Sequence, residues 1–202
     1  GGRAERAQRH PAGCPGTVVA LVLAAGRGVR FGSDKRLAVM ADGRSLLAHS
    51  VDNARAVFDD VRVVLREGER AEAFGLPADC RVVISPEAAC GMGHSLAAGA
   101  ASLADSPAQA VAILLGDMPW IATASLRRLA QAASPSTIVV PCHDGHSGHP
   151  VIFGRDLWPA LQQLAGDQGA RVIVQAHGAR QVRVHLDDAG VLRDVDTPGA
   201  LQ

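Results

Sequence analysis

The segment LAAGRGVRFGSDK, residues 23–35, combines glycines and cations in a way that suits an anionic ligand. Its glycines and basic residues are Gly26, Gly28, Gly32, Arg27, Arg30 and Lys35. Glycines let the backbone approach an anion and point N–H groups at it, while the basic side chains bring positive charge to the same place. The spacing matches neither G-x-G-x-x-G nor G-x-x-x-x-G-K-[ST], which excludes the dinucleotide fingerprint and the Walker A loop. We therefore expect a triphosphate-binding loop, with a basic surface turn as the alternative.

Two acidic segments offer ligands for a magnesium ion. Asp117 lies in GDMP, residues 116–119, directly after an apolar run, and Asp196 lies in DVDTP, residues 194–198. Magnesium is commonly bound by one or two carboxylates together with substrate phosphates and water. Asp117 is thus a candidate Mg²⁺ ligand and Asp196 a second source of carboxylate. The ordinary alternative at each position is an aspartate that shapes a turn or begins a helix.

A third cluster, CHDGHSGH at residues 142–149, gathers cysteine and histidine side chains in one short loop. These are potential transition-metal ligands. A glycine-rich loop without helix or strand spacing seldom preorganises a zinc site, so contact with a ligand, or plain solvation, is the expected role of the histidines.

The composition favours a globular protein and argues against binding to polyanions. Hydrophobic residues make up 48% of the 202 positions and charged residues 20%, which is ordinary for a folded domain. Twenty Lys and Arg are balanced by twenty Asp and Glu, so no broad positive field would hold nucleic acid or an anionic membrane surface. The four cysteines are widely spaced and form no CxxC pair, which favours a reducing, cytoplasmic setting.

The longest apolar stretch, residues 17–25, is about half as long as a membrane-spanning helix needs to be. It follows a basic start and so imitates a signal peptide, but prolines and glycines at residues 11–16 separate the basic part from the apolar part. The first buried strand is the better explanation of this stretch. Residues 1–16 are expected to form a disordered N-terminal extension, and residues 17–202 a single domain.

From residue 17 the sequence alternates short β-branched runs with alanine-rich helical stretches, which indicates parallel strands joined by crossover helices. The predicted strands are residues 18–23, 61–65, 81–84, 110–115, 137–140 and 182–185, and residues 150–153 form a further strand that leaves the parallel pattern. The predicted helices are residues 45–57, 68–74, 91–103, 123–132, 155–164 and 167–176, with Ser45 and Thr123 as N-caps. The predicted fold is an α/β three-layer sandwich with a mostly parallel sheet.

Six motifs occur along the chain in the order found in one enzyme family. They are LAAGRGVRFGSDK (23–35), GMGHSLAAG (91–99), GDMP (116–119), GHPVIF (148–153), GDQGAR (166–171) and DVDTP (194–198). Through them the chain resembles the nucleotidyltransferases of molybdenum cofactor maturation, especially the molybdenum cofactor cytidylyltransferases, from about residue 18 to residue 201. Phe31 replaces the methionine often seen in the first motif, a conservative apolar change.

The resemblance implies a Rossmann-like nucleotidyltransferase fold and a set of site residues. The implied nucleotide-binding residues are Leu23, Ala24, Ala25, Gly26, Arg27, Gly28, Arg30, Lys35 and Ser95. The implied pterin side is formed by Gly148, His149 and Pro150, with residues 166–171 close by. Arg30, Lys35 and Asp117 are the implied catalytic residues, and Asp117 and Asp196 the implied Mg²⁺ ligands.

By the same resemblance, the reaction transfers CMP from CTP to the phosphate of molybdenum-molybdopterin and releases pyrophosphate. Mg²⁺ is the implied cofactor, and a recipient molybdenum hydroxylase is a further implied partner. The sequence LAAG at residues 23–26 favours the cytidylyl type over the guanylyl type, which usually carries two glycines after its alanine. A guanylyltransferase, another small-molecule nucleotidyltransferase and a non-catalytic molybdenum-pterin carrier are the alternatives.

Overall fold

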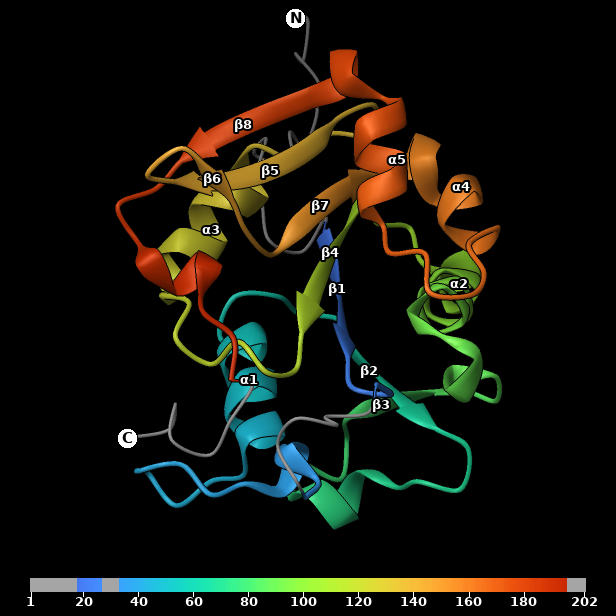
Figure 1. Ribbon diagram of the computed structural model, residues 1–202, viewed down its shortest axis with the longest axis vertical. Helices are drawn as coiled ribbons and strands as arrows, with labels where there is room; N and C mark the ends of the chain where they lie inside the picture. The colour runs from blue at the N-terminus through green and yellow to red at the C-terminus, as the bar shows by residue number, and fades with distance from the viewer. Residues whose placement is uncertain (1–17, 27–32, 196–202) are drawn as a thin grey trace, which may run out of the picture.

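The computed structural model describes residues 18–26 and 33–195. Its centre is an eight-stranded sheet in the order β3-β2-β1-β4-β7-β5-β6, with β8 also paired to β5. The strands are β1 (Val18–Leu23), β2 (Val61–Arg66), β3 (Arg81–Ser85), β4 (Ala110–Leu115), β5 (Ile138–His143), β6 (His146–Ser147), β7 (Val151–Gly154) and β8 (Gln181–His185). The sheet extends through the molecule from β3 at one end to β8 at the other (Figure 1).

Most of the strands are parallel, as predicted. β1 pairs in parallel with β2 and β4, β2 with β3, and β5 with β8. β7 is antiparallel to both β4 and β5, which confirms that residues 150–153 leave the parallel pattern. β6 was not predicted; it forms a hairpin with β5 through Asp144 and Gly145, whose φ angles are 49° and 79°. An Asp-Gly pair is a strong hairpin signal, so the sequence did contain this turn.

Helices cover both faces of the sheet. They are α1 (Leu46–Arg55), α2 (Met92–Ala101), α3 (Thr123–Gln131), α4 (Trp158–Gln162) and α5 (Arg171–Ala176). α1 and α3 pack on one face, whereas α2, α4 and α5 pack on the other (Figure 1). The predicted three-layer α/β sandwich is therefore confirmed.

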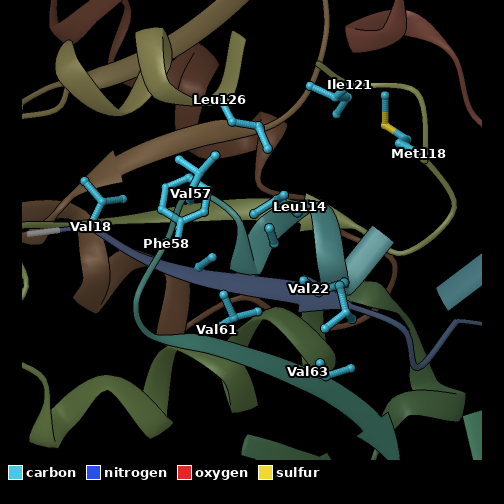
Figure 2. Packing of buried hydrophobic residues seen from close by; sticks show 14 of the residues in the cluster. Val18, Val22, Val57, Phe58, Val61, Val63, Leu114, Met118, Ile121 and Leu126 are labelled. Atoms are coloured by element: carbon cyan, nitrogen blue, oxygen red, sulfur yellow. The ribbon is translucent and has the colours of Figure 1, made fainter. Parts of the chain in front are cut away.

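Strand β1 shows how the sequence builds two cores at once. Val18, Ala20 and Val22 point into the core beneath α1 and α3, and the alternate residues Val19 and Leu21 point into the core on the opposite face. Figure 2 shows the first of these cores, with Val18 and Val22 among the labelled side chains. Full burial of a valine or leucine side chain contributes about 1.5–3 kcal/mol, so both helical layers are anchored on this one strand.

The helix predicted over residues 68–74 is wrong. Only a 3-10 turn forms there, at Ala71–Phe74. Gly68 and Gly75, with φ angles of 81° and 71°, bound a segment that is too short to support an α-helix.

The predicted N-cap of α3 is also wrong, because Ala122 rather than Thr123 precedes the helix. Helix α3 has no side-chain cap, but the carboxylate of Asp188 holds its beginning by accepting hydrogen bonds from the Ala122 N–H at 3.0 Å and from the Ser125 hydroxyl at 2.7 Å. A side chain 66 residues away thus fixes the beginning of α3 without capping it. The predicted cap of α1 is confirmed, since the Ser45 side chain accepts from a backbone N–H of that helix.

The order of the strands determines where a binding site is expected. After β1 the chain moves outward through β2 to β3, and it then returns to β4 on the other side of β1. In open α/β sheets, ligands bind outside the carboxyl ends of the strands at such a reversal. The segments that follow β1 and β4, residues 23–26 and 115–117, lie at this position.

Within residues 18–26 and 33–195, no helix has the length and apolar character that crossing a membrane requires. The N-terminal extension predicted at residues 1–16 lies outside the described residues.

Candidate active site

A cavity of about 380 Å³ opens at the carboxyl ends of β1 and β4. Its walls come from the segments after these two strands, from the 3-10 turn Lys35–Leu37 and from the beginning of α2. Its charged lining residues are Lys35, Arg36, Asp117 and Asp167. We call it the first cavity.

Backbone hydrogen bonds fix the end of β1 between its two neighbours. The Ala24 N–H donates to the Val64 carbonyl of β2 at 3.0 Å. On the other side, the Gly116 N–H donates to the Leu23 carbonyl at 3.0 Å. The chain on both sides of the first cavity is therefore held by the sheet itself.

Two arginines hold the carbonyl groups of the turn that follows. Arg36 donates to the Ala24 carbonyl and Arg66 to the Ala25 carbonyl, each at 2.8 Å. Among the described residues, none accepts a hydrogen bond from the N–H of Ala25 or Gly26. Both residues line the first cavity, so their N–H groups are available to an anion there.

Arg36 lies beneath this turn and is only 6% exposed. Its guanidinium donates to the carboxylates of Asp34 at 2.8 Å and Glu69 at 2.6 Å, and it lies 4.5 Å from the centre of the Phe74 ring. Burial acts to raise the pKa of Glu69, but hydrogen bonds from Arg36 and from the Arg66 N–H outweigh it and leave that pKa below its ordinary value. The buried cation is thus compensated by two carboxylates and supports the turn from below.

Lys35 and Asp117 meet in the first cavity although 82 residues separate them in the sequence. The Lys35 Nζ donates to the Asp117 carboxylate at 2.7 Å and to the Val195 carbonyl at 3.1 Å. The Val195 N–H in turn donates to the Asp117 carbonyl at 2.8 Å. The two charged side chains are 21% and 20% exposed, so the pair faces the cavity from a partly desolvated wall.

Helix α1 fixes the segment that carries Asp117. The Ser50 hydroxyl, in a residue that is 4% exposed, donates to the Gly116 carbonyl at 3.0 Å. The Asn53 amide donates to the Pro119 carbonyl, also at 3.0 Å. These bonds hold the backbone on both sides of Asp117, which restricts where its carboxylate can lie.

The beginning of α2 packs directly on residues 165–167. The Gly93 N–H donates to the Gly166 carbonyl at 2.9 Å, and a Cβ on Gly93 would lie 2.6 Å from the Ala165 carbonyl oxygen. Gly91, the residue before the helix, has a φ of 126°, which residues with a side chain rarely adopt. The glycines of the GMGH and GDQG motifs thus let two distant segments form one wall of the first cavity.

A second cavity, of about 610 Å³, adjoins the first. The two cavities share Leu23, Met92 and Leu115 as lining residues. The second cavity lies against β4, β7, β5 and β8, and it is bounded by α5 and by residues 145–149. Two small molecules, one bound in each cavity, would therefore lie next to each other at the carboxyl ends of β1 and β4.

Of the three residues predicted on the pterin side, Gly148 and His149 line the second cavity. Pro150 is buried and lines neither cavity. The His149 N–H donates to the Val191 carbonyl at 2.9 Å. Burial lowers the pKa of His149 against the opposing pull of two nearby carboxylates, so its ring is neutral at pH 7.

Most of the other predicted site residues lie at the first cavity. They are Leu23, Ala24, Ala25, Gly26, Lys35, Ser95 and Asp117. Four more, Arg27, Gly28, Arg30 and Asp196, lie outside the described residues. Ser95 is 4% exposed, and its hydroxyl lies 3.4 Å from that of Ser85.

Sequence analysis overlooked Arg36, because its importance comes from partners that lie elsewhere in the chain. It also overlooked Arg183, which lines the second cavity. For Arg183 a signal was present, since the alternation Gln181-Val182-Arg183-Val184 places polar side chains on one face of a strand.

The donor set at the first cavity fits magnesium. Asp117 and Asp167 provide two carboxylates, and magnesium commonly takes one or two together with phosphate oxygens and water. In the described part of the chain, which includes the histidine-rich loop at residues 142–149, no three His, Cys, Asp or Glu side chains gather as a metal site.

Known proteins resemble the chain in sequence over nearly its whole length. Residues 20–182 match the family model described as the MobA-like NTP transferase domain. The purine catabolism protein PucB of Bacillus subtilis is 29% identical over 192 residues, which cover 90% of this chain and 92% of that protein.

Solved structures resemble it in fold. The Rv0371c homologue from Mycobacterium sp. strain JC1 superposes with a TM-score of 0.77 at 29% identity, covering 91% of this chain and 92% of that one. The manganese complex of Rv0371C from Mycobacterium tuberculosis gives a TM-score of 0.69 at 28% identity, with 87% and 93% covered. Because the family match spans both strand ends that form the first cavity and most of the sheet, the chain belongs to the MobA-like NTP transferase domain family.

Proposed function

We propose that the protein is a molybdenum cofactor cytidylyltransferase, which transfers CMP from CTP to the phosphate of molybdenum-molybdopterin and releases pyrophosphate. The observation that carries this proposal is the meeting of Lys35 and Asp117 in a cavity that opens into a second, larger one. The first cavity suits the nucleotide and the second the acceptor. The sequence motifs that resemble the cytidylyltransferases supply the identity of the two substrates.

The reaction requires the protein to align its two substrates more than to remove a proton. An acceptor phosphate oxygen forms a bond to the α-phosphorus of CTP, and the bond from that phosphorus to the bridging oxygen breaks, so pyrophosphate leaves with the electron pair. The attacking phosphate is already ionised near pH 7, and no general base is needed. In the proposal, the Ala25 and Gly26 N–H groups bind phosphate oxygens, and Lys35 stabilises the charge of the leaving pyrophosphate.

A divalent cation belongs to this proposal, and we infer that Mg²⁺ is the natural one. Asp117 would hold it, together with Asp196, which lies outside the described residues. The cation would neutralise phosphate charge at the reacting centre. Support comes from the donor set at the first cavity and from the manganese complex of the mycobacterial relative. The hydrogen bond from Ser50 on α1 to the Gly116 carbonyl holds the backbone next to Asp117 in place.

The alternatives differ in the base or in the reaction. A guanylyltransferase would use GTP; the methyl group of Ala25, in the wall of the first cavity, favours the smaller base by only about 1–3 kcal/mol. A molybdenum-pterin carrier would bind the acceptor without turning over nucleotide.

We place the protein in the cytoplasm because Cys80, Cys90 and Cys142 are all free thiols.

Pyrophosphate release with Mg²⁺, molybdenum-molybdopterin and each of CTP, GTP, ATP and UTP tests the proposal. We expect CTP to give the highest kcat/KM, and Asp117→Ala to lower it by roughly a thousandfold. Asp59→Ala, which removes an exposed carboxylate elsewhere, is the matched control and should keep wild-type activity. A preference for GTP would indicate the guanylyl reaction, and acceptor binding without nucleotide-dependent release would indicate a carrier. Full activity of Asp117→Ala would remove that residue from the mechanism.

A further inference from the structure

The second cavity has an unbalanced charge. Its lining includes two arginines, Arg171 at the start of α5 and Arg183 on β8, and no aspartate or glutamate. The first cavity differs, because its cations and carboxylates are matched in number. A ligand that fills the second cavity is therefore expected to bring negative charge with it.

Neither arginine is neutralised by a carboxylate of residues 18–26 or 33–195. Among the described residues, no carboxylate lies within ion-pair distance of Arg171 or Arg183, and the one hydrogen bond of Arg183 goes to the Ser147 hydroxyl at 3.4 Å. Several arginines elsewhere are paired with carboxylates, as Arg44 is with Asp42 at 2.5 Å and Arg62 with Asp60 at 2.9 Å, whereas Arg171 and Arg183 stay exposed. The two cations of the second cavity are thus kept available to a ligand.

Strand register shows how far Arg183 lies from the reacting centre. Ile113 on β4 pairs with Val151 on β7, and Val140 on β5 pairs with Arg183. Continuing the β5–β7 register from Val139–Ile152 brings Val140 opposite Val151, so the four residues form one row across the sheet. Three steps between strands span about 14 Å. Arg183 therefore lies too far from β4 to hold the phosphate that reacts at the first cavity.

The same row shows which side chains lie between the β4 end and the β8 end of the second cavity. Ile113, Val151 and Val140 all line the second cavity, and Phe153 adds an aromatic ring to the same floor. A flat apolar body would cover these side chains and remove them from water. The cavity thus has a reactive end at Leu115, an apolar middle and a cationic far end at Arg183.

We propose that Arg171 and Arg183 bind an acidic group of the acceptor other than the phosphate that reacts, so the enzyme selects acceptors that carry this second acidic group. This inference rests on the proposed function only in taking the second cavity as the acceptor site. Arginine suits the task because its planar group donates two parallel hydrogen bonds to one acid.

A matched pair of fluorescent dyes tests the cationic end without any knowledge of the natural acceptor. 1-Anilinonaphthalene-8-sulfonate carries a flat apolar body and a sulfonate, and N-phenyl-1-naphthylamine carries the same body without charge. We expect the wild-type chain to bind the sulfonate at least tenfold more tightly, since a charge-assisted hydrogen bond is worth roughly ten- to hundredfold in affinity. Arg183→Gln should abolish this preference and leave the affinity for the neutral dye unchanged. Arg171→Gln should reduce it.

Two controls make the dye result specific. Arg183→Lys keeps the charge and should retain part of the preference. Arg128→Gln makes the same change in net charge on α3, across the sheet, and should have no effect. Sulfonate binding that is no tighter than neutral binding in the wild type, or a preference that survives Arg183→Gln, would overturn the inference. An equal loss of both dyes would do so too, because it would indicate a damaged cavity.

Turnover separates this inference from the proposed function. With CTP and molybdenum-molybdopterin, Arg183→Gln should raise the KM for the acceptor about tenfold, while the KM for CTP and kcat change less than twofold. A wild-type chain that never releases pyrophosphate from CTP with this acceptor would contradict the proposed function. The dye comparison would still decide the role of the two arginines.

Discussion

Lys35 is the only lysine in the sequence, and its ammonium group donates to the Asp117 carboxylate at 2.7 Å. The two charges neutralise each other at the wall of the first cavity. A triphosphate offers Lys35 several negative oxygens in place of one carboxylate, and charge-assisted bonds of this kind contribute about 1.5–3 kcal/mol each. Under the proposed function, nucleotide binding should therefore change the surroundings of Lys35.

This uniqueness makes Lys35 directly observable. An amine-reactive reagent such as trinitrobenzenesulfonate should modify Lys35 and the α-amino group, and CTP with Mg²⁺ should protect only the lysine. Peptide mass spectrometry measures the modified fraction at each amine, and the α-amino group serves as the internal control. In calorimetry, Lys35→Ala should bind CTP at least tenfold more weakly. Labelling of Lys35 that is indifferent to CTP would count against its assignment to the nucleotide.

At the level of single residues, sequence reasoning succeeded where the sheet does the positioning. Lys35 and Asp117 each follow a parallel strand, and carboxyl ends of neighbouring parallel strands share one edge, so their meeting was predictable. The role of Arg36 was not, because its partner Glu69 lies 33 residues away in an irregular connection. No local pattern specifies that contact.

The contact of α2 with residues 165–167 shows what glycine contributes at the level of elements. A Cβ on Gly93 would lie 2.6 Å from a backbone oxygen that cannot move without moving its segment. The same segment contributes Asp167 to the first cavity. Gly93 is therefore expected to link the stability of the fold with the shape of the first cavity.

Gly93→Ala should destabilise the protein by about 1–3 kcal/mol, the usual cost of forcing extra atoms into a packed contact. It should also weaken CTP binding, because α2 and the segment at 165–167 would separate at the cavity wall. Gly169→Ala is the control, since its added Cβ would meet only the Met92 sulfur, at 3.9 Å. Urea denaturation and CTP titration measure the two effects. Equal stability of the two variants would mean that the segment yields without cost.

Elements were predictable wherever an apolar run was long enough to need cover on both faces. β1, β2 and β4 appear within one residue of their predicted bounds for this reason. The short hairpin strand β6 has only two residues and no apolar pattern, so only the Asp-Gly turn before it could have predicted it. β7 contributes Val151 and Phe153 to the second cavity, and its pairing between β4 and β5 could not be predicted because local sequence does not specify pairing partners.

At the scale of the whole molecule, the sheet divides the work between two regions. The first cavity lies among the parallel strands β3, β2, β1 and β4, where the strand order reverses between β1 and β4. The mixed region from β7 to β8 forms the floor of the second cavity. β4 belongs to both. The Arg36–Glu69 ion pair belongs to the parallel region, because it joins the turn after β1 to the connection between β2 and β3.

This pair predicts how the stability of the molecule depends on pH. The pKa of Glu69 is held below the 4.5 of a free carboxyl, so the folded state takes up a proton less readily than the unfolded state. Its contribution is complete above the unfolded value and is lost as pH falls through the folded one. The free energy of unfolding should therefore decrease between about pH 5 and pH 3.

Glu69→Gln isolates that contribution. At pH 7 the variant should be less stable than the wild type by about 1–3 kcal/mol, because Arg36, only 6% exposed, loses one of its carboxylates. Near pH 3 the difference should shrink, since protonation has already weakened the pair in the wild type. Glu72→Gln, which changes a carboxylate that is 67% exposed and 3.8 Å from Arg70, should follow the wild-type curve throughout. Urea denaturation at a series of pH values gives the three curves, and a constant gap between wild type and Glu69→Gln would mean that Glu69 titrates alike in the folded and unfolded chains.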